Sequence, residues 1–279
     1  MHLGAVLNIP DLQKLGLTAG PAEDIAELPE AERSGLGLSF EQAGIIPAQT
    51  GGYCNLVSTD EAHRRKCVAR LRETLAAAEQ AGVRTVICGG GHRDPDCPEA
   101  VFSPHPDNWT QPARELLAQS CAEVLDGFSS KVTKLTIETW VMTPLDSPRA
   151  ARDLVDAVKH PNLGILFDPV NMMNLDRHFR TGEFVAECID TFGDAITHVH
   201  AKDTRILADR FTYHMAEVPI GSGRMDYARL LREMTRLPED VSLIIEHLDT
   251  FDAYAAAAAK LREIAAAEGI DFAGKGRAA

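Results

Sequence analysis

Hydrophobic and polar positions alternate along this chain in a repeated strand–helix rhythm. Short apolar runs are typical of buried strands, and apolar residues spaced three and four apart are typical of helices. The clearest helix is Thr59–Ala81, where Val68, Leu71 and Leu75 keep the helical spacing. Ser58 or the first residue of that range is the expected N-cap. A regular α/β protein is therefore the first expectation.

The same rhythm continues after this helix. Further helices are predicted at 112–127, Ser147–Lys159, Thr181–Phe192, Asp226–Arg236 and Asp252–Glu268. Strands are predicted at Val83–Cys88, Lys134–Glu138, Leu163–Asp168, Ala195–His200 and Val241–Glu246. Ser147 is the predicted N-cap of its helix, and the proline that follows it is predicted at the first helical position. Residues 95–111 are rich in proline and predict a long loop.

The first 58 residues have a weaker pattern. We expect a strand at His2–Ile9, a loop at Pro10–Gly20, an acidic helix at Pro21–Arg33 and a strand at Gly44–Ala48. A short strand at Gly35–Ser39 and one helical turn at Phe40–Ala43 complete the pattern.

Counting the short one, the chain has eight expected strands. Repeated βαβ units predict a parallel sheet, and eight of them predict a closed (β/α)8 TIM barrel of class α/β with shortened first β/α units. A doubly wound open sheet is the alternative, but the G-x-G-x-x-G fingerprint for a dinucleotide is missing after the first strand. We expect residues 1–279 to form one domain with a disordered tail at 273–279.

Four strands end in a side chain that can bind a metal. Glu138, Asp168, His200 and Glu246 each follow apolar residues. Strand C-termini converge on one mouth of a parallel barrel, and three carboxylates there would repel one another without a cation. A set of three carboxylates and one imidazole suits Mn²⁺ best, with Mg²⁺, Co²⁺ and Zn²⁺ as alternatives.

Charge and cysteine content narrow the class of protein. The formal net charge is −13 at pH 7, which argues against nucleic acid and anionic membranes as partners. The six cysteines contain no C-x-x-C pair, so we expect free thiols in a reducing compartment. No apolar run is long enough to span a bilayer, and no signal-peptide pattern opens the chain, so we expect a cytoplasmic protein.

Several segments resemble the xylose-isomerase-like TIM barrels, a superfamily of sugar and sugar-phosphate isomerases and epimerases. They are Thr-Ile-Glu-Thr-Trp at 136–140, Phe-Asp-Pro-Val-Asn at 167–171, His-Val-His-Ala-Lys-Asp at 198–203, Pro-Ile-Gly-Ser-Gly-Arg-Met-Asp at 219–226 and Ile-Ile-Glu-His at 244–247. The resemblance runs from about Gly44 to Glu268. It implies that the four strand-end residues hold the metal.

The resemblance also implies a reaction. The two glutamates, Glu138 and Glu246, would be the catalytic acid/base pair that moves a proton α to a carbonyl, through an enediolate stabilised by the metal. The ketose 3-epimerases of this superfamily carry a histidine where this chain has Asn171, and an arginine where it has Ala216, Glu217 and Val218. That particular activity is therefore not implied. Dimers are common in the superfamily, so a homodimer is expected.

Substrate contacts are expected from residues near the strand ends, on a small carbohydrate: His92, Trp140, Asn171, Lys202 and Asp203. His92 follows three glycines that allow close approach of a ligand, and Trp140 could stack on a sugar. Lys202 could instead be a solvated lysine paired with its neighbour.

Other histidines and two loop residues carry weaker expectations. His198 is expected in the core or behind the ligands, and the remaining histidines at 63, 105, 160 and 178 are expected at the surface. Tyr213 and His214 lie on a loop that could cover the mouth.

Two other functions fit the same residues. Metal-assisted abstraction of an α-proton also drives β-elimination, so a lyase or dehydratase acting on a keto-sugar or cyclitol is the first alternative. A metallo-hydrolase that resembles endonuclease IV is the second. That branch needs additional histidines and a basic face, whereas this chain has Asn171 and is acidic.

Overall fold

Eight parallel strands close into a barrel. The computed structural model describes residues 1–22, 25–209 and 211–273, so most of the tail predicted to be disordered lies outside the described residues. The order around the barrel is β1-β10-β7-β6-β5-β4-β3-β2. These strands are β1 His2–Ala5, β2 Ala19–Pro21, β3 Ile46–Gly51, β4 Thr85–Gly89, β5 Lys134–Glu138, β6 Leu163–Phe167, β7 Ile196–Ala201 and β10 Ser242–Ile245. The predicted TIM barrel is confirmed.

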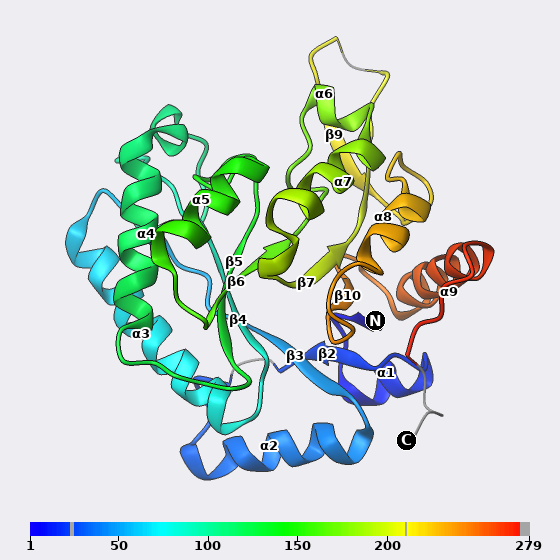
Figure 1. Ribbon diagram of the computed structural model, residues 1–279, viewed down its shortest axis with the longest axis horizontal. Coiled ribbons are helices and arrows are strands. Elements are labelled where there is room, and N and C mark those ends of the chain that lie inside the picture. Colours follow the sequence, from blue (N-terminus) through cyan, green and yellow to red (C-terminus); the bar gives the residue numbers. More distant parts are fainter. Residues whose placement is uncertain (23–24, 210, 274–279) are drawn as a thin grey trace.

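Helices surround the strands, as Figure 1 shows. They are α1 Ile9–Lys14, α2 Glu30–Ala43, α3 Glu61–Gln80, α4 Gln111–Leu125, α5 Pro148–Val158, α6 Leu175–His178, α7 Thr181–Phe192, α8 Tyr227–Met234 and α9 Phe251–Ala267. Two short 3₁₀ helices, η1 Pro106–Trp109 and η2 Gly193–Ala195, precede α4 and β7. No helix in the described part of the chain is long and apolar enough to cross a membrane.

From residue 59 onward, every predicted helix and strand is present with ends within two residues of the prediction. Ser147 caps α5 by accepting a hydrogen bond from the backbone of Ala150. The cap of α3 is Asp60 rather than Ser58 or Thr59, because its carboxylate accepts from the backbone of Ala62 and His63. A carboxylate at this position also favours the positive end of the helix dipole.

The N-terminal predictions are partly wrong. β1 ends at Ala5 because Asn8 caps α1, which occupies part of the expected loop. The strand expected at Gly35–Ser39 lies inside α2, and the helix expected at Pro21–Arg33 begins only at Glu30. Gly37 lies where α2 packs against the end of α3, and a Cβ there would lie 2.6 Å from the carbonyl oxygen of Ala81. This glycine permits close helix packing rather than a strand.

A hairpin that the sequence did not predict follows β7. β8 Asp203–Ile206 pairs antiparallel with β9 Met215–Val218, outside the barrel sheet. Its connection projects beyond the strand ends in Figure 1. The hairpin adds a wall to the mouth of the barrel on the side of β7.

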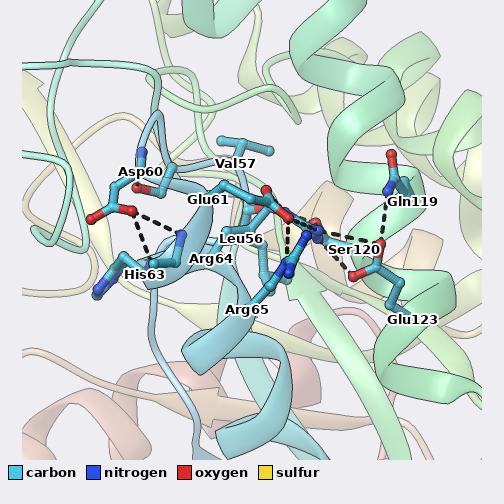
Figure 2. A network of polar contacts seen from close by, with 12 residues as sticks. Leu56, Val57, Asp60, Glu61, His63, Arg64, Arg65, Gln119, Ser120 and Glu123 are labelled. Carbon is cyan, nitrogen blue, oxygen red and sulfur yellow. Dashed lines mark hydrogen bonds and ion pairs between the residues drawn. The ribbon is translucent and has the colours of Figure 1, made fainter.

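A buried arginine fastens α3 to α4 near the same mouth (Figure 2). Arg64 is only 3% exposed and pairs with Glu61 and Glu123 at 2.7 and 2.8 Å. It also donates to the Ser120 hydroxyl, which in turn donates to the carbonyl oxygen of Leu56. The two carboxylates balance the charge of the guanidinium. The hydrogen bond from Ser120 to Leu56 holds the loop after β3 in place.

Candidate metal centre

Four side chains from four strands meet at the mouth of the barrel. Glu138 ends β5, Asp168 directly follows β6, His200 lies near the end of β7 and Glu246 directly follows β10. One potential ligand atom from each lies within 4.8 Å of the others, and all four residues are buried. The predicted ligand set is therefore brought together by parallel strands that end in register.

The imidazole of His200 points one nitrogen at the carboxylates. Nδ1 lies 2.9 Å from Glu246 Oε2, 3.5 Å from Glu138 Oε1 and 3.8 Å from Asp168 Oδ2. Nε2 lies 3.1 Å from the amide oxygen of Gln49 on β3. Because an amide oxygen only accepts, this contact assigns a proton to Nε2 and leaves Nδ1 as the ligand atom when the ring is neutral.

Lys202 reaches into the same cluster, although its side chain is only 3% exposed. Nζ lies 2.7 Å from Glu246 Oε1 and 2.9 Å from Asp168 Oδ2. Burial lowers the pKa of this lysine, but the two carboxylates outweigh burial and raise the pKa above its usual range. Lys202 is therefore a permanent internal cation that offsets part of the carboxylate repulsion, not a solvated lysine.

Burial and nearby charges shift the pKa values of the candidate ligands in different directions. Burial raises the pKa of Asp168 to about 6 against the opposing charge of Lys202. Burial would lower the pKa of His200, but Glu246 and Glu138 outweigh it and raise the value to about 10. Burial would raise the pKa of Glu246, but His200 and Lys202 lower it below its usual range.

The donor atoms fit a divalent ion. Asp168 Oδ2 and His200 Nδ1 are buried and make no hydrogen bond within the described residues. Their nearest charged neighbours are Lys202 Nζ and Glu246 Oε2, each at 2.9 Å. Buried polar atoms without a hydrogen bond are rare, and here both face the same cluster. Three carboxylates and one imidazole are a mostly oxygen set, which suits a hard or borderline divalent ion.

Two residues hold Glu138 in place. The Tyr53 hydroxyl donates to Oε2 at 2.8 Å, and Asn171 Nδ2 donates to Oε1 at 2.9 Å. The backbone N–H of Asn171 also donates to Asp168 Oδ1 at 2.9 Å. Burial and the nearby Glu138 charge raise the pKa of Tyr53 well above its usual value, so the phenol stays a donor. Asn171, predicted to bind substrate, thus fastens two ligands.

The hairpin contributes an ion pair that the sequence did not predict. Glu217 on β9 lies 3.0 Å from Nδ1 of His247, and this contact raises the pKa of His247. Nζ of Lys202 lies 3.4 Å from the same nitrogen. His247 adopts φ 57°, a left-handed conformation that is uncommon outside glycine. No local sequence pattern predicts the contact between Glu217 and His247, because it joins the hairpin to the segment after β10.

A cavity of about 380 Å³ opens beside the ligands. His200, Glu246 and His247 form one part of its lining, and β3 with the loop after it supplies Gln49, Thr50, Gly51 and Tyr53. Val6, Pro21, Ile25, Ala26, Glu27, Arg70, Thr74 and Ile87 complete the lining. The volume lies in the range of small-molecule sites in proteins.

Three predicted substrate contacts lie elsewhere. His92 is buried, with Nε2 2.8 Å from the carbonyl oxygen of Ala100. Trp140 packs edge-on against Phe102 at 4.2 Å between ring centroids. Asp203 accepts backbone hydrogen bonds from residues 204, 221, 223 and 225. None of the five predicted substrate-contact residues is among the residues that line the cavity, so their contact with substrate stays a prediction.

Two of the remaining histidines are buried. His198 lies in the core behind His200, as predicted, at 5.4 Å between ring centroids. His178 on α6 is only 1% exposed, so the expectation of a surface residue is wrong. His178 ends the short helix α6, which has no clear apolar period, and its ring packs edge-on against that of Phe179. Tyr213 is exposed beside β9, and its role as a cover stays a prediction.

Solved structures share this fold. A xylose isomerase-like TIM barrel protein from Mycobacterium smegmatis in complex with magnesium has 17% identity, covers 93% of this chain and 87% of its own, and gives a TM-score of 0.68. The probable 3-DHS dehydratase AsbF from Bacillus anthracis has 14% identity over 94% and 99%, with a TM-score of 0.69. The 3-keto-D-glucoside 4-epimerase YcjR from E. coli has 16% identity over 94% and 99%, with a TM-score of 0.67.

These identities show a common fold and no specific activity. No curated protein matches the chain. A family model described as Xylose isomerase-like TIM barrel matches residues 13–271. The match extends over nearly the whole barrel, including all four strand-end ligands. The chain therefore belongs to the xylose isomerase-like TIM barrel family.

Proposed function

We propose that this protein is a divalent-metal-dependent isomerase or epimerase of a small carbohydrate or related polyol. The main supporting observation is a cluster of four side chains beside a cavity of about 380 Å³. One potential ligand atom from each lies within 4.8 Å of the others, and the four are Glu138, Asp168, His200 and Glu246. We propose Mn²⁺ as the preferred ion, because the mostly oxygen set suits a hard or borderline cation. When bound, such an ion polarises a substrate carbonyl and its neighbouring hydroxyl.

The residues of the chain would carry the proton. Glu138 and Glu246 belong to β5 and β10, which β6 and β7 separate, so their carboxylates can flank a substrate. One takes the proton α to the carbonyl and the other returns it. Tyr53 fixes Oε2 of Glu138, and Lys202 fixes Oε1 of Glu246, so both carboxylates are oriented before substrate arrives.

A metal-dependent lyase or dehydratase is the second candidate. His247 is a donor beside Glu246, with Nε2 3.8 Å from Glu246 Oε1, and its contact with Glu217 raises its pKa. Elimination needs a donor for the departing hydroxyl as well as a base for the α-proton. This arrangement could supply both. We propose no nucleic-acid or membrane partner, given the acidic chain, and a homodimer as the assembly.

Proton NMR in D₂O tests both candidates. Ketoses, aldoses, inosose-type cyclitols and 3-keto-sugars are incubated with protein and Mn²⁺, with EDTA controls. Deuterium beside a carbonyl together with a new isomer supports the first candidate, and an unsaturated product supports the second. In either case EDTA should abolish the reaction.

Substitution tests the roles of the glutamates. Glu246→Gln and Glu138→Gln should each lower turnover at least about 100-fold, because each removes a proton carrier. Calorimetry with Mn²⁺ should still detect binding to Glu246→Gln, since the amide oxygen remains a ligand. Glu239→Gln, at an exposed position before β10, is the matched control and should be unchanged. Wild-type turnover in Glu246→Gln would refute the proposal.

A further inference from the structure

One arginine side chain that lines the cavity has no hydrogen bond or ion pair to any described residue. Arg70 on α3 contributes to the same lining as His200 and Glu246. Arg70 is an exposed residue, and within the described residues its side chain has no hydrogen bond or ion pair. Ion pairs are common among the arginines of this protein, so an unpaired guanidinium that faces a functional cavity needs an explanation.

The other arginines of α3 are engaged. Arg64 and Arg65 pair with Glu61, as Figure 2 shows for both. Arg72 donates to the carbonyl oxygen of Glu123 at 2.7 Å. These three side chains contact α4 or run along the helix, whereas Arg70 contributes to the lining of the cavity. Its five donors are therefore free to meet an acceptor in the cavity.

We propose that Arg70 binds an anionic group of the substrate, a carboxylate or a phosphate, while the reacting carbons lie at the metal ligands. The position of the reacting carbons rests on the proposed function, whereas the anion site at Arg70 does not. A guanidinium matches the paired oxygens of either group with two parallel hydrogen bonds. The substrate class is therefore an anionic sugar derivative, such as a keto-acid or a sugar phosphate, rather than a neutral sugar.

The other lining residues fit an amphipathic ligand that carries one anionic group. Ile25 and Ile87 offer apolar surface to a carbon skeleton, and Gln49 and Thr50 offer polar groups to hydroxyls. Glu27 also lines the cavity, from the loop after β2, and its carboxylate disfavours an anion close to it. In a protein of net charge −13, an anionic substrate needs such a local cation to be retained.

The first experiment measures anion binding to the full-length protein. Inorganic phosphate and acetate are titrated separately by calorimetry into wild type, Arg70→Ala, Arg70→Lys and the control Lys66→Ala. Lys66 is an exposed cation on the same helix with no part in the cavity. Arg70→Ala should weaken binding of at least one anion about ten-fold or more, Arg70→Lys should lie between, and Lys66→Ala should match wild type.

The two probes distinguish the sources of the anionic group. Stronger Arg70-dependent binding of phosphate indicates a phosphorylated substrate, and stronger binding of acetate indicates a carboxylate. Equal binding of both probes to wild type and Arg70→Ala, or no binding at all, would overturn the proposal. Phosphate held at the metal ligands would not depend on Arg70, so it cannot mimic the expected result.

The second experiment separates this inference from the proposed function. Matched pairs, such as a ketose and its terminal phosphate, are compared in the D₂O assay. The anionic member should have the higher kcat/KM, and Arg70→Ala should remove that preference mainly through KM. Arg70-dependent anion binding without any exchange would count against the proposed reaction and leave the anion site intact. Exchange that prefers the neutral member equally in both proteins would count against the anion site.

Discussion

The chemistry of single residues centres on His200. Its Nε2 contacts Gln49 Oε1 at 3.1 Å, and its Nδ1 faces three carboxylates. A ligand histidine is oriented by the partner of its other nitrogen, and loss of that partner commonly weakens metal binding 10- to 100-fold. Gln49 is therefore a positioning residue of this site.

Replacing Gln49 tests this role. Gln49→Leu should weaken Mn²⁺ binding about 10- to 100-fold, because the ring can then rotate or change tautomer. Isothermal titration calorimetry measures the affinity, and circular dichroism checks that the barrel is intact. Gln80→Leu is the control, since that amide lies on the surface at the end of α3. An unchanged affinity would show that packing alone holds the imidazole.

The pH dependence of metal binding follows from the same ring. Without metal, His200 has a pKa of about 10, so it is protonated at pH 7. Metal binding needs a neutral Nδ1 and must release this proton. Mn²⁺ affinity should therefore rise as pH increases from 7 toward 10 and level off above. Calorimetry in buffers of different ionisation enthalpy should detect about one proton released per ion; affinity independent of pH would contradict the assignment.

At the scale of elements, the β8–β9 hairpin completes the mouth. Asp203 opens the hairpin and accepts four backbone hydrogen bonds, from Thr204, Gly221, Gly223 and Met225. A Cβ at Gly223 would lie 2.2 Å from Asp203 Oδ1, so the turn needs glycine there. The carboxylate thus ties the hairpin to the loop before α8 and fixes the position of Glu217.

Removing this carboxylate should cost stability. Asp203→Ala leaves four buried or half-buried N–H groups without their acceptor, and we expect a loss of about 3 kcal/mol in the free energy of unfolding. Urea denaturation followed by circular dichroism measures it. Glu73→Ala, an exposed carboxylate on α3, should change the free energy by about 0.5 kcal/mol or less. A loss equal to this control would show that the loop holds its own shape.

For the whole molecule, binding of the proposed ion would be coupled to folding. The barrel brings three carboxylates together, and Lys202 and protonated His200 offset only part of their repulsion. An ion that binds the folded state alone stabilises it by about 2.7 kcal/mol at 100 times its Kd. The unfolded chain lacks this arrangement, because its ligands are far apart in sequence.

Thermal unfolding with added Mn²⁺ tests this coupling. The melting temperature of wild type should rise with Mn²⁺ concentration and fall again with EDTA. Asp168→Ala should show little dependence on Mn²⁺, because it removes a ligand side chain altogether. A melting temperature insensitive to Mn²⁺ in wild type would contradict a metal centre at these residues.

The chemical residues of the site were predictable because they lie where local pattern and topology agree. Glu138, Asp168 and Glu246 each close an apolar run, and parallel strands bring such ends to one mouth. The first 58 residues were less predictable, because β2 has only three residues and α2 carries Gly37 where it approaches the end of α3. Tertiary packing, rather than helical periodicity, defines those elements.

The sequence by itself determined the barrel class, the barrel strands and main helices after residue 59, and the four candidate ligands, since these depend on hydrophobic period and on residues at strand ends. Only the tertiary structure decided how the ligands are held. Gln49 meets His200 across 151 residues, and Tyr53 meets Glu138 across 85. Lys202 and Arg70 look alike in the sequence as ordinary cations. Barrel closure buries one among carboxylates and leaves the other facing the cavity, because contacts between distant segments leave no local pattern.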